Sequence, residues 1–166
     1  MVIHFTQNLP KALQEIQFFE YRGFVVHEKE EIRTYLNSDE LVSKYGDSKW
    51  AVIDLLNERY NSSFDLHNWV NKNEDDEVAY FINEAGSNCL NYSQFKIPHK
   101  FHLWLGKKGF VLGVEQKGVG FNAEEIHHQK LKDNEGAAFD FFRNCQSKVF
   151  FDNSENARIV FMIFLG

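Results

Sequence analysis

The stretch Glu84-Ala85-Gly86-Ser87-Asn88-Cys89-Leu90-Asn91-Tyr92 decides the fold that the sequence predicts. Glu84 and Asn88 are four residues apart and therefore share one face of a helix. Apolar residues repeat at helical spacing around them: Val78, Ile82, Ala85 and Cys89. The carboxylate and the amide point about 100° away from the apolar row, at the edge of the buried stripe. Such a pair can hold a water molecule and a metal ion, so the pattern predicts an amphipathic helix with a site along its edge.

The flanking sequence predicts where this helix begins and which elements come after it. Asn73 is the expected N-cap, and the acidic residues 74–77 suit the positive end of a helix. Residues 100–105 and 110–115 alternate or run apolar around a glycine turn, which predicts a hairpin. Residues 148–152 and 158–165 predict a second hairpin.

Between the hairpins, the sequence predicts two further helices. Asn122 and Glu125 form a capping box for a short helix, and residues 138–145 carry one apolar face of a second. The main elements then run helix, two strands, helix, two strands. This order predicts an α/β (α+β) two-layer sandwich, with a mixed, mostly antiparallel sheet and helices on one face.

A glycine turn follows the first hairpin, in the run Val114-Glu115-Gln116-Lys117-Gly118-Val119-Gly120-Phe121. Together with the helix, this run resembles the N-box and first glycine box of the GHKL (histidine kinase-like) ATPase superfamily, and the anti-sigma-factor serine kinases are the most similar branch. In the N-box, Glu84, Ala85, Asn88 and Tyr92 stand at the matching positions. In the glycine box, Gly118, Gly120 and Phe121 match. The resemblance covers about residues 74–166.

The glycine boxes depart from the family pattern in two places. Gln116 stands where the family has an aspartate that accepts a hydrogen bond from the adenine amino group. Glutamine can accept through its side-chain oxygen, but without the charge that makes such a bond about twice as strong. The second glycine box would fall at residues 136–139 and retains only its first glycine, Gly136. The resemblance therefore implies a partly degenerate nucleotide site.

The resemblance also implies a role for each matching residue. Glu84 would be catalytic, positioning or deprotonating the nucleophile, and Asn88 would coordinate Mg²⁺ through the nucleotide. The nucleotide-binding set would be Asn88, Tyr92, Gln116, Gly118, Gly120 and Gly136, with Mg-ATP as the cofactor if one binds. Without the resemblance, Glu84 and Asn88 are ordinary polar residues of a helix edge, and Gly118 and Gly120 are turn glycines with positive φ.

Composition restricts the other function classes. The chain has 166 residues with 43% hydrophobic and 25% charged residues, which is typical of a globular protein. A net charge of −6 argues against nucleic acid or an anionic membrane as partner. Cys89 and Cys145 lack paired spacing and are expected to be reduced core thiols, which indicates a cytoplasmic protein. No targeting segment or membrane-spanning run is recognisable.

Residues 1–72 carry no family motif and are expected to form a mainly helical N-terminal extension, with residues 73–166 as the GHKL ATPase-like domain. Possible helices span residues 10–19, 28–37, 48–60 and 65–70, with a short strand at 23–26. The histidines are assigned to solvated or structural positions: His127 and His128 point in different directions, and His99 and His102 have no carboxylate or cysteine nearby in sequence.

These observations favour a signalling or regulatory protein with a partly degenerate nucleotide site, acting mainly by binding a regulatory protein partner. The alternative is an active Mg-ATP-binding serine kinase or ATPase similar to the anti-sigma-factor kinases. Position 116 separates the two interpretations, because its side chain decides how strongly adenine is recognised.

Overall fold

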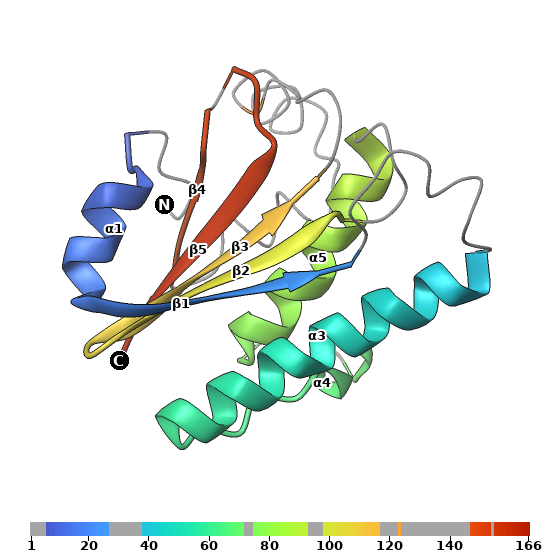
Figure 1. The fold of residues 1–166 in the computed structure, drawn as a ribbon, viewed down its shortest axis with the longest axis horizontal. Coiled ribbons are helices and arrows are strands. Elements are labelled where there is room, and N and C mark those ends of the chain that lie inside the picture. Colours follow the sequence, from blue (N-terminus) through green and yellow to red (C-terminus); the bar gives the residue numbers. More distant parts are fainter. Residues whose placement is uncertain are drawn as a thin grey trace.

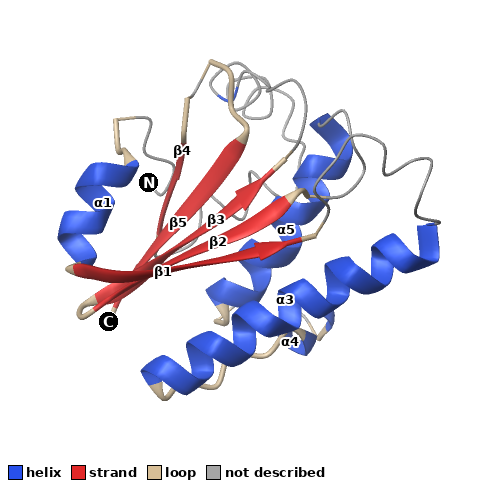
Figure 2. Ribbon diagram, in the orientation of Figure 1, coloured by secondary structure: helices blue, strands red, loops and turns tan. Residues whose placement is uncertain are grey.

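The computed structural model contains a five-stranded antiparallel sheet with helices on both faces, an α+β fold (Figure 1; Figure 2). It describes residues 6–26, 38–71, 75–92, 98–116, 123, 147–153 and 155–166, without the side chains of residues 38–42 and 86–92. The strand order is β1-β2-β3-β5-β4, and every described pair is antiparallel. The expected α+β class is confirmed, and the expectation of a mixed sheet is wrong for the described strands.

The chain begins with helix α1 (Leu9–Ile16) and strand β1 (Phe18–Val25). Asn8 caps α1, since its side chain accepts a hydrogen bond from the Lys11 N–H at 3.0 Å. Gln17 ends the helix in the left-handed region, at φ 55°. The helix expected over residues 10–19 is therefore too long, because Phe18 and Phe19 already belong to the sheet.

In the part of the chain that the structure describes, β1 is followed by three helices: α3 (Ser38–Tyr60), α4 (His67–Val70) and α5 (Glu77–Tyr92). Asp76 caps α5, because its Oδ1 accepts from the Ala79 N–H at 3.0 Å. Its Oδ2 accepts from the Asp65 N–H and from Nδ2 of Asn68, both at 2.8 Å, which ties the segment before α4 to the start of α5. The helix expected from residue 48 begins ten residues earlier, and the helix expected over residues 28–37 lies outside the described part.

Both expected hairpins are confirmed: β2 (Lys100–Gly106) with β3 (Gly109–Glu115), and β4 (Lys148–Phe151) with β5 (Ile159–Leu165). β5 also pairs with β3, so the second hairpin extends the sheet on that side. Gly109 in the first turn has φ 151°, and a Cβ there would collide with the carbonyl oxygen of Phe164. The position therefore requires glycine.

The sheet has two apolar faces, each covered by different helices (Figure 1). Side chains such as Leu103 and Leu112 point to the α3 and α5 face, where the larger core contains Ile53 and Phe81. The second face packs α1 through Ala12 and Ile16 against Val111, Phe150, Phe161 and Ile163. The prediction of helices on one face is wrong, because α1 covers the other.

Residues 1–72, expected to be mainly a helical extension, supply an edge strand of the sheet. β1 pairs with β2 from Phe18 to Val25, with an irregularity between Phe18 and Glu20. The strand expected at residues 23–26 corresponds only to the end of β1. The domain division at residue 72 stays a prediction.

Candidate functional site

Glu84 lies on α5 as the amphipathic pattern predicts, at the border of the buried face. Val78, Ile82 and Ala85 of the same helix are fully buried, whereas Glu84 is half-buried. Its Oε1 accepts a hydrogen bond from Nε1 of Trp69 in α4, at 2.8 Å. The carboxylate predicted to be catalytic is therefore bound by the protein's own indole.

The residue before it, Asn83, forms a second polar contact on α5. Nζ of Lys49 donates to Oδ1 of Asn83 at 3.2 Å, and Asn83 Nδ2 donates to the Ala79 carbonyl at 2.8 Å. Burial lowers the pKa of the Lys49 ammonium. Nζ of Lys49 also lies 4.4 Å from the centre of the Tyr45 ring. The Lys49–Asn83 hydrogen bond therefore connects α3 to α5 at the residue before Glu84.

Gln116 follows β3 directly and has an exposed fraction of 2%. Strand alternation gives its side chain the direction of Leu112 and Val114, toward the α3 and α5 face. Its backbone N–H donates to the Arg158 carbonyl at 2.8 Å, and its Nε2 donates to the Ala157 carbonyl at 3.2 Å. The side chain predicted to read adenine is packed against the segment that leads into β5.

Most other predicted site residues are not described. Asn88 and Tyr92 lie on α5, but the structure gives only their helical backbone. Gly118, Gly120 and Gly136 lie outside the described residues, as do Cys145, His127 and His128. Glu84 and Gln116 are thus the only members of the set whose side chains can be compared, and each contacts a different element. The site assignment stays a prediction.

A cluster that sequence reasoning missed lies on the opposite face of the sheet. Nδ1 of His102 lies 2.7 Å from Oη of Tyr21, and its Nε2 lies 2.7 Å from Oε1 of Glu115. His99 Nε2 is 4.0 Å from Oε2 of the same carboxylate. The expectation that these two histidines lack a carboxylate partner is wrong. Glu115 is their partner because the hairpin turn brings it beside them.

The electrostatics of this cluster favour an ionised carboxylate. The hydrogen bond from His102 holds the pKa of Glu115 below its usual range, against the opposing effect of burial. When Nε2 of His102 donates to Glu115, Nδ1 of a neutral ring accepts a hydrogen bond from the Tyr21 hydroxyl. In an imidazolium, Nδ1 instead donates a hydrogen bond to the Tyr21 oxygen. The Trp104 ring stacks on His102 at a centroid distance of 5.3 Å. The three side chains Tyr21, His102 and Glu115 form a continuous polar chain from β1 to β3.

The sequence contained a signal for half of this chain. A turn at residues 106–109 sets His102 opposite Gly113, which places Glu115 one diagonal step away on the same face. Gly23, opposite His102 on the other side, leaves room for Tyr21. A Cβ at Gly23 would lie 2.9 Å from Oη of Tyr21.

A cavity of about 530 Å³ opens at the other end of β3 from Gln116. Phe64, Phe110 and Phe164 contribute apolar walls, and Asp75 and Asp76 contribute carboxylates. Because Gly109 lines it, this cavity lies beside the β2–β3 turn.

Among the residues that the structure describes, no group of three His, Cys, Asp or Glu side chains is arranged to hold a metal ion. In the same part of the chain, no helix combines the length and the hydropathy needed to cross a membrane. Comparison with protein-family models, with curated proteins and with solved structures finds no match for this chain.

Proposed function

We propose that this protein is a signalling or regulatory protein with a histidine kinase-like ATPase fold and a partly degenerate nucleotide site, acting mainly by binding another protein. The support begins with the order of elements: α5 with its Glu84 and Asn88, then the β2–β3 hairpin, then the β4–β5 hairpin. The GHKL resemblance expects this order. A cytoplasmic location and a regulatory protein partner belong to the same proposal.

The observation that carries the proposal is the burial and hydrogen bonding of the Gln116 side chain. Its side chain points to the α5 face, where the resemblance expects the nucleotide, but it is 2% exposed and its amide donates to Ala157. A base could reach this side chain only if the residues that bury it moved. Replacing the family's aspartate by a buried, backbone-bound amide is the change expected when adenine recognition is lost.

Glu84 supports the same conclusion. Its Oε1 accepts the indole N–H of Trp69, so a nucleophile would have to be activated through the other lone pairs of the carboxylate. Gln116, as it stands, therefore does not fit adenine, and we derive no phosphoryl-transfer step. The alternative, an active Mg-ATP-dependent kinase or ATPase, requires the Gln116 contact to open.

Isothermal titration with ATP and Mg²⁺ tests the proposal. We expect no saturable heat up to about 1 mM ATP. Saturable binding that Asn88→Ala weakens and Asn91→Ala, a control on the same helix, leaves unchanged would overturn the degenerate-site proposal and favour the active enzyme.

Gln116→Asp provides a second arm of this test. If position 116 were the only defect, the aspartate would restore a charged acceptor and create measurable ATP binding. We expect no gain, because a carboxylate at this position would face the Ala157 carbonyl that Gln116 now satisfies. Tight binding by Gln116→Asp would show that the rest of the pocket is intact.

A further inference from the structure

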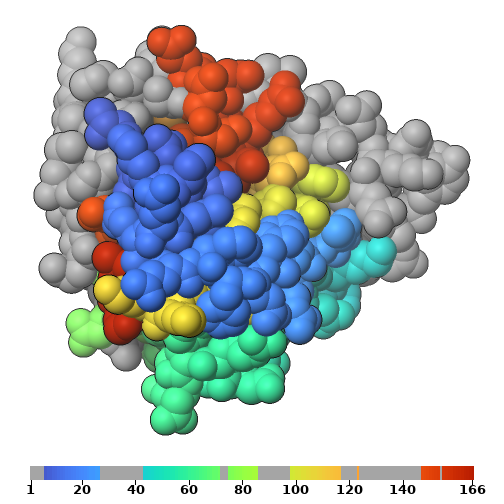
Figure 3. Space-filling view, turned by 60° about the vertical axis from the view of Figure 1, so that its left-hand side comes forward, coloured from blue at the N-terminus to red at the C-terminus, as the bar shows by residue number. Residues whose placement is uncertain are grey.

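The outer edge of β1 combines a strand edge with exposed apolar side chains. β1 is the first strand of the sheet order, and among the described strands only β2 pairs with it. Figure 3 shows the blue atoms of this strand at the surface, between α1 and α3. Four of its apolar side chains are 40–56% exposed: Phe18, Phe19, Tyr21 and Val25. An exposed strand edge with apolar side chains is a template for pairing with another strand.

We propose that β1 pairs antiparallel with β1 of a second copy of this chain, about a two-fold axis at Tyr21, so that two five-stranded sheets join edge to edge. This inference goes beyond the proposed function, because it names a partner and a surface. It concerns a different part of the molecule from the predicted nucleotide site and does not depend on that site.

The backbone groups of β1 that face outward can be assigned. The Val26 N–H donates to the His99 carbonyl at 2.9 Å and therefore points toward β2. Because the backbone alternates along a strand, Tyr21, Gly23 and Val25 direct their N–H and carbonyl groups to the outer edge. With a two-fold axis at Tyr21, the ladder centres on the two Tyr21 residues and extends to Gly23, which faces Phe19 of the partner subunit. It ends before Gln17, whose carbonyl accepts the Lys107 N–H at 3.2 Å.

Charge selects the register. An axis at Tyr21 sets Glu20 opposite Arg22 of the partner subunit, twice by symmetry. An axis at Arg22 would set two arginines opposite each other, and an axis at Gly23 would set Glu20 opposite an apolar residue, Val26 of the partner subunit. Opposite charges across a strand pair are favourable and like charges are unfavourable. Of these three registers, only the axis at Tyr21 pairs the charges.

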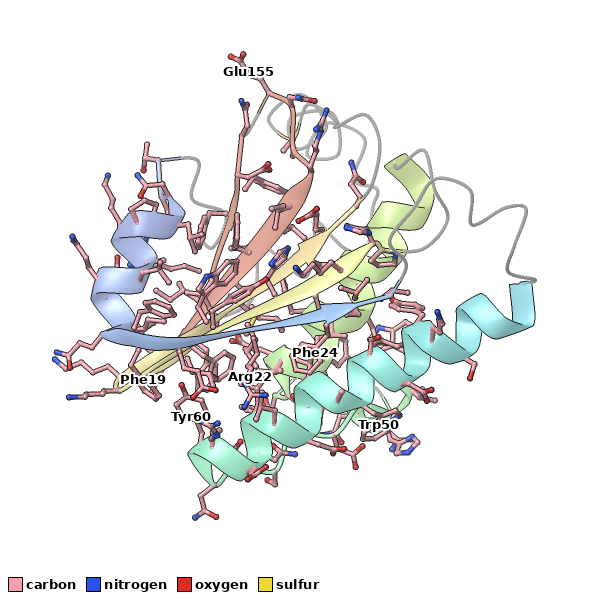
Figure 4. The ribbon with its side chains drawn as sticks, in the orientation of Figure 1. Phe19, Arg22, Phe24, Trp50, Tyr60 and Glu155 are labelled. Carbon is pink, nitrogen blue, oxygen red and sulfur yellow. The ribbon has the colours of Figure 1, made fainter. Side chains whose placement is uncertain are left out.

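Both charges are already held in suitable positions. Nε of Arg22 lies 2.8 Å from Oε2 of Glu20 on the same strand, and Nη1 of Arg59 lies 2.9 Å from Oε1 of Glu20. Figure 4 shows Arg22 on the side of β1 that faces α3. Two-fold pairing would extend this contact into an alternating square of Glu20 and Arg22 from both copies.

The opposite side of the strand brings the two Tyr21 rings together. Each ring is held by its own His102, with Oη and Nδ1 2.7 Å apart, so little side-chain freedom remains to be lost on association. Aromatic pairs across neighbouring strands stabilise a sheet. The same two-fold axis therefore matches charges on one face and aromatic rings on the other.

Charge reversal tests the register through a mixing experiment. The wild type should show a concentration-dependent monomer–dimer equilibrium in sedimentation or mass photometry between about 1 µM and about 1 mM. Arg22→Glu places two carboxylates opposite each other, and Glu20→Arg places two guanidinium groups opposite each other. Each variant alone should raise the dissociation constant by about tenfold or more, since two cross-strand pairs change sign.

The two variants mixed in equal amounts should recover the dimer. In the mixed pair, both arginines of one copy face both glutamates of the other, and native mass spectrometry separates this heterodimer by mass. Arg158→Glu and Glu155→Arg make the same charge changes at exposed residues of the β4–β5 connection, and Figure 4 shows Glu155 far from β1. These two controls should dimerise like the wild type.

Three results would overturn the proposal. The first is a wild type that stays monomeric throughout the range. The second is dimerisation that neither Arg22→Glu nor Glu20→Arg weakens, or that both controls weaken equally. The third is a mixture that associates no better than each variant alone. Arg22 is 53% exposed, so Arg22→Glu should keep its fold, which circular dichroism verifies.

Discussion

Replacing Glu115 by glutamine should remove a charge-assisted hydrogen bond while keeping the shape of the side chain. The carboxylate lies 2.7 Å from Nε2 of His102 and 4.0 Å from Nε2 of His99. A hydrogen bond to a charged group contributes about 1.5–3 kcal/mol when it is buried. The side chain is 27% exposed, so solvent screens part of this interaction. We expect Glu115→Gln to lower the free energy of unfolding at pH 7 by about 1–2 kcal/mol.

The difference should depend on pH in one direction. The unfolded chain protonates Glu115 near the ordinary value of about 4.3. The folded protein protonates it at lower pH, because His102 holds its pKa down. Between these two values the unfolded state binds more protons, so the contribution of the carboxylate is complete above the unfolded pKa and is lost as pH falls through the folded pKa. The wild type and Glu115→Gln should therefore converge in stability in acid.

Thermal unfolding from pH 7 to pH 3 measures both effects. For a chain of this length, about 1 kcal/mol corresponds to about 2–4 °C, so Glu115→Gln should lower Tm by about 2–8 °C at pH 7. Glu155→Gln removes a carboxylate from an exposed position and should leave Tm within about 1 °C. Equal Tm values for the wild type and Glu115→Gln at pH 7, or a difference that grows as pH falls below about 4.3, would refute this account of the cluster.

Two further substitutions test the first hairpin. Oη of Tyr60 shares its proton between the carbonyls of Gly106 and Gly109, both at 2.9 Å, and accepts the Gly106 N–H at 3.0 Å. Tyr60→Phe should therefore lower the free energy of unfolding in urea by about 1–3 kcal/mol. A decrease below about 0.5 kcal/mol would contradict the contact. Gly109→Ala should cost about 2 kcal/mol or more, because φ is 151° and Phe164 blocks the Cβ. Gly46→Ala, in α3 with open space at its Cβ, should instead be neutral or stabilise by up to about 1 kcal/mol, and equal losses at both glycines would argue against the turn geometry.

The sequence predicted α5 and both hairpins because their patterns are local. Val78, Ile82 and Ala85 repeat at the helical period, and all three are buried. The turn at residues 106–109 joins two strands whose register follows from the turn itself. In each case the residues that determine the element are neighbours in the sequence, so backbone geometry and apolar spacing are sufficient.

Prediction from the sequence was wrong for elements whose exposure depends on the rest of the fold. Most of β1 is exposed, so its residues show no clean alternation of polar and apolar side chains, and its first two residues were assigned to a helix. The placement of α1 on the second face of the sheet was also missed. An amphipathic pattern shows that a helix packs on an apolar surface, but it does not show which face of a sheet provides that surface.

The candidate sites show the same division. The sequence by itself placed Glu84 at the edge of an amphipathic helix and contained, in the hairpin register, the proximity of His102 and Glu115. Only the tertiary structure joined Tyr21 to His102 across 81 residues, bound Glu84 to Trp69 and packed Gln116 against Ala157, 41 residues away. The physical reason is that periodicity along a chain fixes which way a side chain points, whereas its partner is decided by how all the apolar faces of the molecule are buried together.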